Sequence, residues 1–117
     1  MRLLHAAFLV SDLQAAHDFY GKLLGLETEE RPDLGFPGLW YRLEAGQQIH
    51  LMLLPHSGIE GNGHGGRDRH VAFSVQDLEI FSSRLDEAGI AYTLSRSGRR
   101  ALFCRDPDGN ALEFVES

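Results

Sequence analysis

Four side chains that can bind a divalent metal occur as two equivalent pairs in this chain. The segment HAAFLVSDL, which begins at His5, returns from His70 as HVAFSVQDL. His50 and Glu113 become counterparts when the glycines preceding them are aligned. Three imidazoles and one carboxylate are suitable ligands for a divalent first-row metal. Because a repeat at fixed spacing indicates a fold built twice, both pairs could face one shared metal ion.

The strands that carry these residues place all four on one kind of surface. Side chains alternate between the two faces of a strand, and in each predicted strand the bulky apolar residues alternate with the metal-binding candidates. The apolar face is expected to cover a helix, so His5, His50, His70 and Glu113 should point away from the helices. The strands concerned are predicted at 3–10, 48–54, 70–75 and 111–116.

The remaining elements complete two βαβββ modules. Apolar residues recur at helical spacing after Asp12 and after Asp77, and Gly25 and Gly89 end the two runs. The predicted fold class is α+β, with module 1–54 and module 70–117 joined by a glycine-rich loop at 55–69. We expect a curved mixed-sheet cup with the helices on its outer face. Further strands are predicted at 27–30, 39–44, 91–95 and 100–105.

Composition limits the classes of partner. A chain of 117 residues with 43% apolar content fits one globular domain, and its net charge of -6 argues against a nucleic-acid partner. The sequence has no apolar run long enough for a membrane span. The single cysteine, Cys104, cannot form an internal disulfide and is expected to pack inside a strand, which fits a cytoplasmic protein.

Other polar and aromatic residues have both a functional and a purely structural interpretation. An arginine cluster near residues 96–100, including Arg100, and a second one before His70 could hold a substrate carboxylate or phosphonate, or could be solvated. Three residues of the predicted strands could line a substrate pocket or could belong to the core: Trp40, Arg42 and Phe103. Three histidines are expected to face solvent: His17, His56 and His64.

The chain resembles the vicinal oxygen chelate superfamily, which includes glyoxalase I, bleomycin-resistance proteins, fosfomycin-resistance thiol transferases and extradiol dioxygenases. The N-terminal segment 1–26 is particularly similar to bacterial glyoxalase I. The resemblance implies that His5, His50, His70 and Glu113 hold a divalent ion such as Ni, Zn, Mn or Fe, and that the chain forms a homodimer. The segments that carry the resemblance are residues 3–13, 18–26, 70–73, 106–110 and 112–113.

This resemblance also suggests a reaction. His50 stands where glyoxalase I has a glutamate, so Glu113 is the expected catalytic proton carrier. The expected function is that of a metal-dependent lyase or isomerase acting on a small substrate with vicinal oxygens, through Lewis-acid stabilisation of an enolate-like intermediate. An Fe(II) extradiol-type dioxygenase and a thiol transferase stay open as alternatives, both using His5, His70 and Glu113. A non-catalytic binding protein like those of bleomycin resistance is the third alternative.

Overall fold

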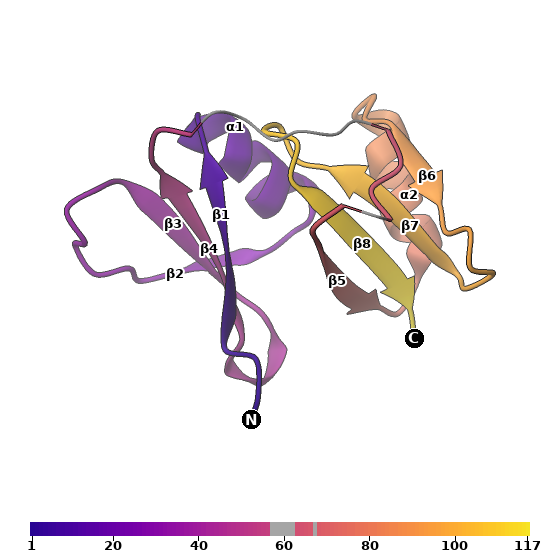
Figure 1. Cartoon of the computed structure of the whole chain (residues 1–117), viewed down its shortest axis with the longest axis horizontal. Coiled ribbons are helices and arrows are strands. Elements are labelled where there is room, and N and C mark those ends of the chain that lie inside the picture. Colours follow the sequence, from indigo (N-terminus) through magenta and orange to yellow (C-terminus); the bar gives the residue numbers. More distant parts are fainter. Residues whose placement is uncertain (57–62, 67) are drawn as a thin grey trace. The chain divides into compact units, whose positions relative to one another are not determined.

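The computed structural model describes residues 1–56, 63–66 and 68–117, and the chain divides into two compact units, Met1–Ser57 and Gly58–Ser117. Each unit is described by itself (Figure 1). Of the predicted connecting loop at 55–69, residues 57–62 and 67 lie outside the described residues.

Both units have the predicted βαβββ order. The first contains β1 (His5–Val10), α1 (Leu13–His17), a π-helical segment (Asp18–Leu23), β2 (Glu27–Glu29), β3 (Gly38–Arg42), a 3-10 turn (Glu44–Gly46) and β4 (Gln48–Leu53). The second contains β5 (His70–Val75), α2 (Leu78–Glu87), β6 (Tyr92–Leu94), β7 (Ala101–Arg105) and β8 (Ala111–Glu116). The α+β fold class is therefore confirmed, and each predicted strand is present with small differences at its ends.

The two sheets share one topology. Their strand orders are β1-β4-β3-β2 and β5-β8-β7-β6, and in each the first strand runs parallel to the last while the other pairs are antiparallel. A parallel pair needs a long crossover connection, and in each unit this connection contains the helix and the other two strands of the sheet. This topology puts the first and last strands, which carry the candidate metal ligands, side by side at the end of each sheet.

The helices begin at the aspartates from which the sequence predicted them to start. The carboxylate of Asp12 accepts the N–H groups of Gln14 and Ala15, and that of Asp77 accepts the N–H of Glu79. A side-chain oxygen at this position satisfies backbone donors that have no partner within the helix. Gly89 follows α2 with a φ of +69°, a left-handed conformation that favours glycine.

The first helix differs from the prediction in its second half. It was expected to continue to Gly25 as an α-helix, whereas α1 ends at His17 and the backbone continues as a π-helical segment. The ring of His17 was expected to face solvent, and that prediction is wrong. Its Nδ1 is 2.8 Å from the buried hydroxyl of Tyr41. Gly21 leaves the space for it, because a Cβ there would lie 2.3 Å from the imidazole.

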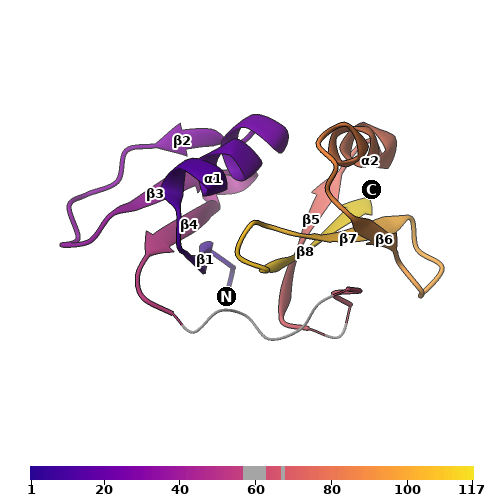
Figure 2. The same ribbon diagram turned by 90° about the horizontal axis from the view of Figure 1, so that it is seen from above.

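The predicted alternation of faces is confirmed in β1, β4 and β5, whereas residues 111–114 of β8 are all buried. Phe8 and Val10 of β1 and Ile49 and Leu51 of β4 are buried, while His5 is exposed on the opposite face. In the second unit, α2 lies on one side of the sheet (Figure 2) and packs against β7 and β8. The largest fully buried side chains come from both units: Tyr20, Tyr41, Ile49, Leu51, Leu85, Leu102, Leu112 and Val10.

Candidate metal centre

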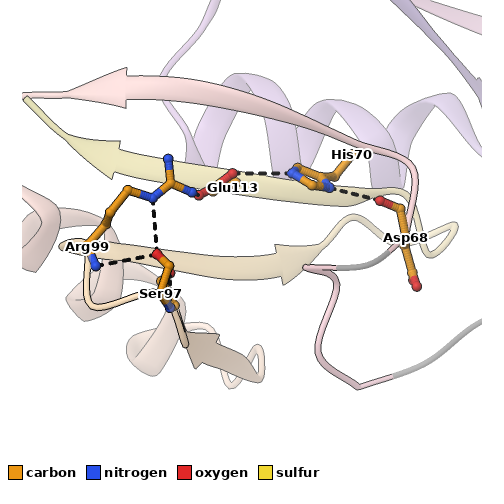
Figure 3. Close-up of polar contacts among 6 residues, drawn as sticks. Asp68, His70, Ser97, Arg99 and Glu113 are labelled. Carbon is orange, nitrogen blue, oxygen red and sulfur yellow. Dashed lines mark hydrogen bonds and ion pairs between the residues drawn. The ribbon is translucent and has the colours of Figure 1, made fainter.

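The second unit brings His70 and Glu113 together. His70 begins β5, and Glu113 lies on the adjacent parallel strand β8, where it pairs in register with Ala72. The Nε2 atom of His70 is 3.3 Å from Oε2 of Glu113 (Figure 3). The Glu113 side chain is only 4% exposed, whereas that of His70 is 26% exposed. The pair thus has a desolvated carboxylate and a partly accessible ring.

The protonation of His70 follows from its second contact. Its Nδ1 lies 2.8 Å from the backbone carbonyl oxygen of Asp68, and because a carbonyl can only accept, Nδ1 carries the proton. In the neutral ring, Nε2 then directs its lone pair at the Glu113 carboxylate. Two acceptors at this distance repel each other unless a cation, either a proton or a metal ion, lies between them.

The spacing of these two atoms suits a metal ion. Histidine nitrogens and carboxylate oxygens bind zinc at about 2.0–2.2 Å, so two such ligands at a near-tetrahedral angle are about 3.3 Å apart. A backbone carbonyl that accepts from the other ring nitrogen is also the usual way in which a metal-binding histidine is oriented. His70 and Glu113 therefore fit a divalent metal.

Arg99 engages the other oxygen of Glu113. Its Nη2 donates to Oε1 at 2.8 Å, and its Nε donates to the Ser97 hydroxyl at 3.2 Å. Oε2 is thus the oxygen on the His70 side (Figure 3). Arg100, in contrast, pairs with Glu116, which also accepts the N–H of Leu78 at the start of α2. Of the two, it is Arg99 that contacts a candidate ligand.

A further arginine supports the segment before β5. The guanidinium of Arg105 forms an ion pair with the Asp68 carboxylate and donates to the Gly109 carbonyl at 2.9 Å. Asp68 therefore links Arg105 to His70, because its side chain binds Arg105 and its backbone carbonyl accepts a hydrogen bond from His70. Neither residue was recognised from the sequence, although the repeat makes Arg105 the counterpart of Arg42.

The Phe103 ring contacts both His70 and His64. The Phe103 ring meets His70 edge to face with centroids 5.3 Å apart, and His64 contacts the Phe103 ring in the same manner at 4.8 Å. His64 also hydrogen-bonds to the Thr93 hydroxyl. Its predicted exposure to solvent is wrong, because Gly65 and Gly66 let this segment lie directly against β7 and β8. His56 is likewise only half exposed.

In the first unit, His5 and His50 lie together as part of an aromatic column. The His50 ring is stacked between His5, at a centroid distance of 4.0 Å, and Trp40, at 4.1 Å. Its Nε2 is 2.8 Å from Oε1 of Gln48, whose amide nitrogen donates to Glu29. Burial, followed by the nearby His5 and Arg31, lowers the pKa of His50, which favours the neutral, metal-binding form.

The stacked arrangement sets a condition for metal binding by this pair. The His5 and His50 rings are within 12° of parallel, and an imidazole binds a metal ion in the plane of its ring. Two parallel rings lying one above the other cannot both hold one ion in their planes. At least one of them must turn about its χ2 bond for the two lone pairs to meet.

Within residues 1–56, 63–66 and 68–117, no three His, Cys, Asp or Glu side chains gather closely enough to hold an ion. The structure places the four predicted ligands as two pairs, one in each unit. The remaining predicted site residue, Arg42, forms an ion pair with Glu27 and is 58% exposed. No helix in the described part of the chain has both the length and the apolar character needed to cross a membrane.

Comparison with known proteins places the chain in a family. The model of the Glyoxalase/Bleomycin resistance protein/Dioxygenase superfamily matches residues 2–114. The chain belongs to this superfamily. It is 32% identical over 128 residues to the lactoylglutathione lyase of Escherichia coli O157:H7, covering 99% of this chain and 93% of that relative. It is 30% identical over 117 residues to the glutathione transferase FosA of Serratia marcescens, with coverages of 94% and 77%.

Solved structures of glyoxalase family proteins share the fold. The family member from Enterococcus faecalis gives a TM-score of 0.71 at 29% identity, covering 98% of this chain and 97% of that one. A glyoxalase/dioxygenase from Nostoc punctiforme gives a TM-score of 0.78 at 24% identity, with coverages of 97% and 88%. The family and its fold were both predicted correctly from the sequence.

Proposed function

We propose that this chain is a metal-dependent enzyme of the glyoxalase type that acts on a small substrate with two vicinal oxygens. The relationship between His70 and Glu113 carries the proposal. In its neutral form, an imidazole whose other nitrogen donates to a carbonyl directs its lone pair at a buried carboxylate 3.3 Å away. Such a pair is stable when it shares a cation.

The ion would be held by His70 and Glu113 together with His5 and His50. A donor set of histidine nitrogens and one carboxylate suits Ni, Zn, Mn or Fe(II). When bound, the ion would act as a Lewis acid on the two neighbouring oxygens of the substrate. Membership of a superfamily that includes lactoylglutathione lyases and FosA supports this type of chemistry.

Glu113 is the proposed proton carrier. Its Oε1 accepts from Arg99, which holds the carboxylate in one orientation. Its Oε2 is then the atom positioned to exchange a proton with a bound substrate. Because the Arg99 side chain is 59% exposed, we propose that it positions Glu113 and takes no part in the proton transfer.

Metal analysis of the purified full-length chain tests the proposal. We expect wild type to bind one equivalent of zinc or nickel, and Glu113→Gln to bind it roughly 100-fold more weakly, because the variant loses a charged ligand. Glu116→Gln is the matched control, since that glutamate lies on the same strand and also pairs with an arginine. Equal metal binding by wild type and Glu113→Gln would contradict the proposal.

Turnover separates the possible reactions. The relatives named lactoylglutathione lyase suggest the hemithioacetal of methylglyoxal and glutathione as the first substrate to test, with nickel or zinc added. A metal-dependent rate that Glu113→Gln abolishes would support the lyase. A folded protein that binds an apolar ligand without metal would instead favour a binding module.

We also propose a homodimer located in the cytoplasm. Superfamily members of this length usually pair, and one buried cysteine suits a reducing compartment. Light scattering on the purified chain tests the assembly, and a mass of one subunit at micromolar concentration would contradict it.

A further inference from the structure

Arg31 lies beside the start of β3 in the first unit. It belongs to the connection between β2 and β3, and its guanidinium rests against Gly38, the first residue of β3. A Cβ on Gly38 would lie 2.9 Å from Nε of Arg31, so the arginine occupies the space that a side chain there would need. Trp40 follows two residues later, about 7 Å along the strand, and stacks on His50.

The guanidinium of Arg31 has donors without acceptors. Its Nε and Nη2 are buried, and neither has a hydrogen-bond partner within the described part of the chain. These two nitrogens share one edge of the guanidinium, the edge that donates two parallel hydrogen bonds to a carboxylate. The Phe36 ring, 4.9 Å from Cζ, supports the group through its face and uses none of its N–H donors.

This situation differs from that of four other arginines. Acidic side chains pair with Arg42, Arg99, Arg100 and Arg105. Burying a charged group without a partner costs free energy, and N–H donors that form no hydrogen bond add to that cost. An anion can complete such a group, and here this requires the surrounding side chains to move, because neither nitrogen is open to solvent.

We propose that Arg31 binds a carboxylate of the substrate. This inference rests on the proposed function, and it narrows the substrate class to small acids that carry vicinal oxygens at one end and a carboxylate at the other. Gly38, against which Arg31 rests, is two residues from Trp40, which stacks on the proposed ligand His50, so the two ends should be several bonds apart. A five-carbon 2-oxo diacid has this form.

Two probes of equal chain length test the site. 2-Oxoglutarate and 2-oxopentanoate have the same vicinal oxygens, but only the first has a distal carboxylate. Binding to the full-length, zinc-loaded chain can be followed by NMR through the indole N–H of Trp40, the single tryptophan. We expect 2-oxoglutarate to bind about tenfold or more tightly than 2-oxopentanoate, as charge-assisted hydrogen bonds predict.

Variants assign the preference to Arg31. Arg31→Gln should bind both acids equally, and Arg31→Lys should keep only part of the preference because it lacks the paired donors. Arg2→Gln is the matched control: it removes the same charge from an exposed arginine of the same unit, which contacts only the Ala45 carbonyl among the contacts assigned to it. The control should retain the full preference.

A stability measurement keeps the test valid if Arg31→Gln folds poorly. Arg31→Met keeps the length of the side chain and removes the unpaired charge, so its Tm should equal or exceed that of wild type. A lower Tm for Arg31→Met, equal binding of the two acids by wild type, or a preference that survives in Arg31→Gln would each overturn the proposal.

The two proposals fail separately. If binding of both acids is independent of zinc while the preference still depends on Arg31, the anion site stands and the metal proposal fails. If binding requires zinc but wild type does not distinguish the acids, the metal proposal stands and the Arg31 site fails. No detectable binding of either acid, with or without zinc, overturns the Arg31 site.

Discussion

Trp40 and Phe103 occupy the same register position in the two units. Trp40 lies directly opposite His50 across β3 and β4, and Phe103 lies directly opposite Glu113 across β7 and β8. Each aromatic ring also contacts a candidate histidine: Trp40 stacks on His50, and Phe103 meets His70 edge to face. The repeat therefore preserves an aromatic neighbour beside each proposed ligand pair as well as the ligands themselves.

Truncation of Phe103 should destabilise the second unit. The ring is buried between His64 and His70, so Phe103→Ala leaves a cavity and removes both ring contacts. We expect the free energy of unfolding to fall by about 3–5 kcal/mol, measured by urea denaturation. Leu94→Ala on β6 is the control, because that side chain is 65% exposed and should change the value by less than about 0.5 kcal/mol.

Arg105 should position His70 through Asp68. In Arg105→Gln the ion pair to Asp68 is lost, so the carbonyl that orients His70 is held less firmly. We expect zinc affinity to fall about tenfold while the fold is kept, measured by competition with a chromogenic chelator and by circular dichroism.

Its counterpart in the repeat provides the comparison for that variant. Arg42 is 58% exposed and pairs with Glu27, whereas Arg105 is 16% exposed and pairs with Asp68. Arg42→Gln should leave zinc affinity unchanged, since an exposed ion pair contributes little. Equal effects of the two substitutions would show that Arg105 has no special relation to His70.

Cys104 should be unreactive in the native chain. The thiol is buried on β7, and burial raises its pKa from 9.0 to about 12. At pH 8 the thiolate fraction is then about 1000-fold lower than in the unfolded chain, and the thiolate is the reacting form. Alkylation by iodoacetamide should be at least about 1000-fold slower in buffer than in guanidinium chloride. Rapid native labelling would contradict the buried position.

Glu116 should make the second unit sensitive to acid. Hydrogen bonds from Arg100 and from the Leu78 N–H lower the pKa of this carboxyl below its ordinary value of 4.5. A lowered pKa in the folded state gives stability that is present above the ordinary pKa and is lost as the pH falls through the lowered value. The loss should therefore occur below about pH 4.5.

Glu116→Gln tests this origin of the acid sensitivity. Urea unfolding at pH 7 and pH 3 should differ less in the variant than in wild type, because the neutral amide does not titrate. An unchanged difference between the two pH values would assign the acid sensitivity to other carboxylates.

The sequence by itself determined the architecture of each unit. Alternation of apolar residues set the strand faces, and Asp12 and Asp77 at the helix starts, with Gly89 after the second helix, set the helix ends. These signals are local, since they depend on side-chain periodicity and on backbone conformations that one residue type favours. The repeat made His5 the counterpart of His70, and His50 the counterpart of Glu113. The sheet topology then placed His5 beside His50, and His70 beside Glu113, on adjacent strands.

Only the tertiary structure decided how these residues are held. Asp68 and Arg31 lie in connections without periodicity, so nothing in the chain predicted that one would orient His70 and the other would rest against Gly38. The stacking of His5 on His50 depends in the same way on side-chain rotamers and on the packing around them. Contacts between segments far apart in sequence are set by the packing of the whole unit. They cannot be predicted from the periodicity of side chains or from turn residues.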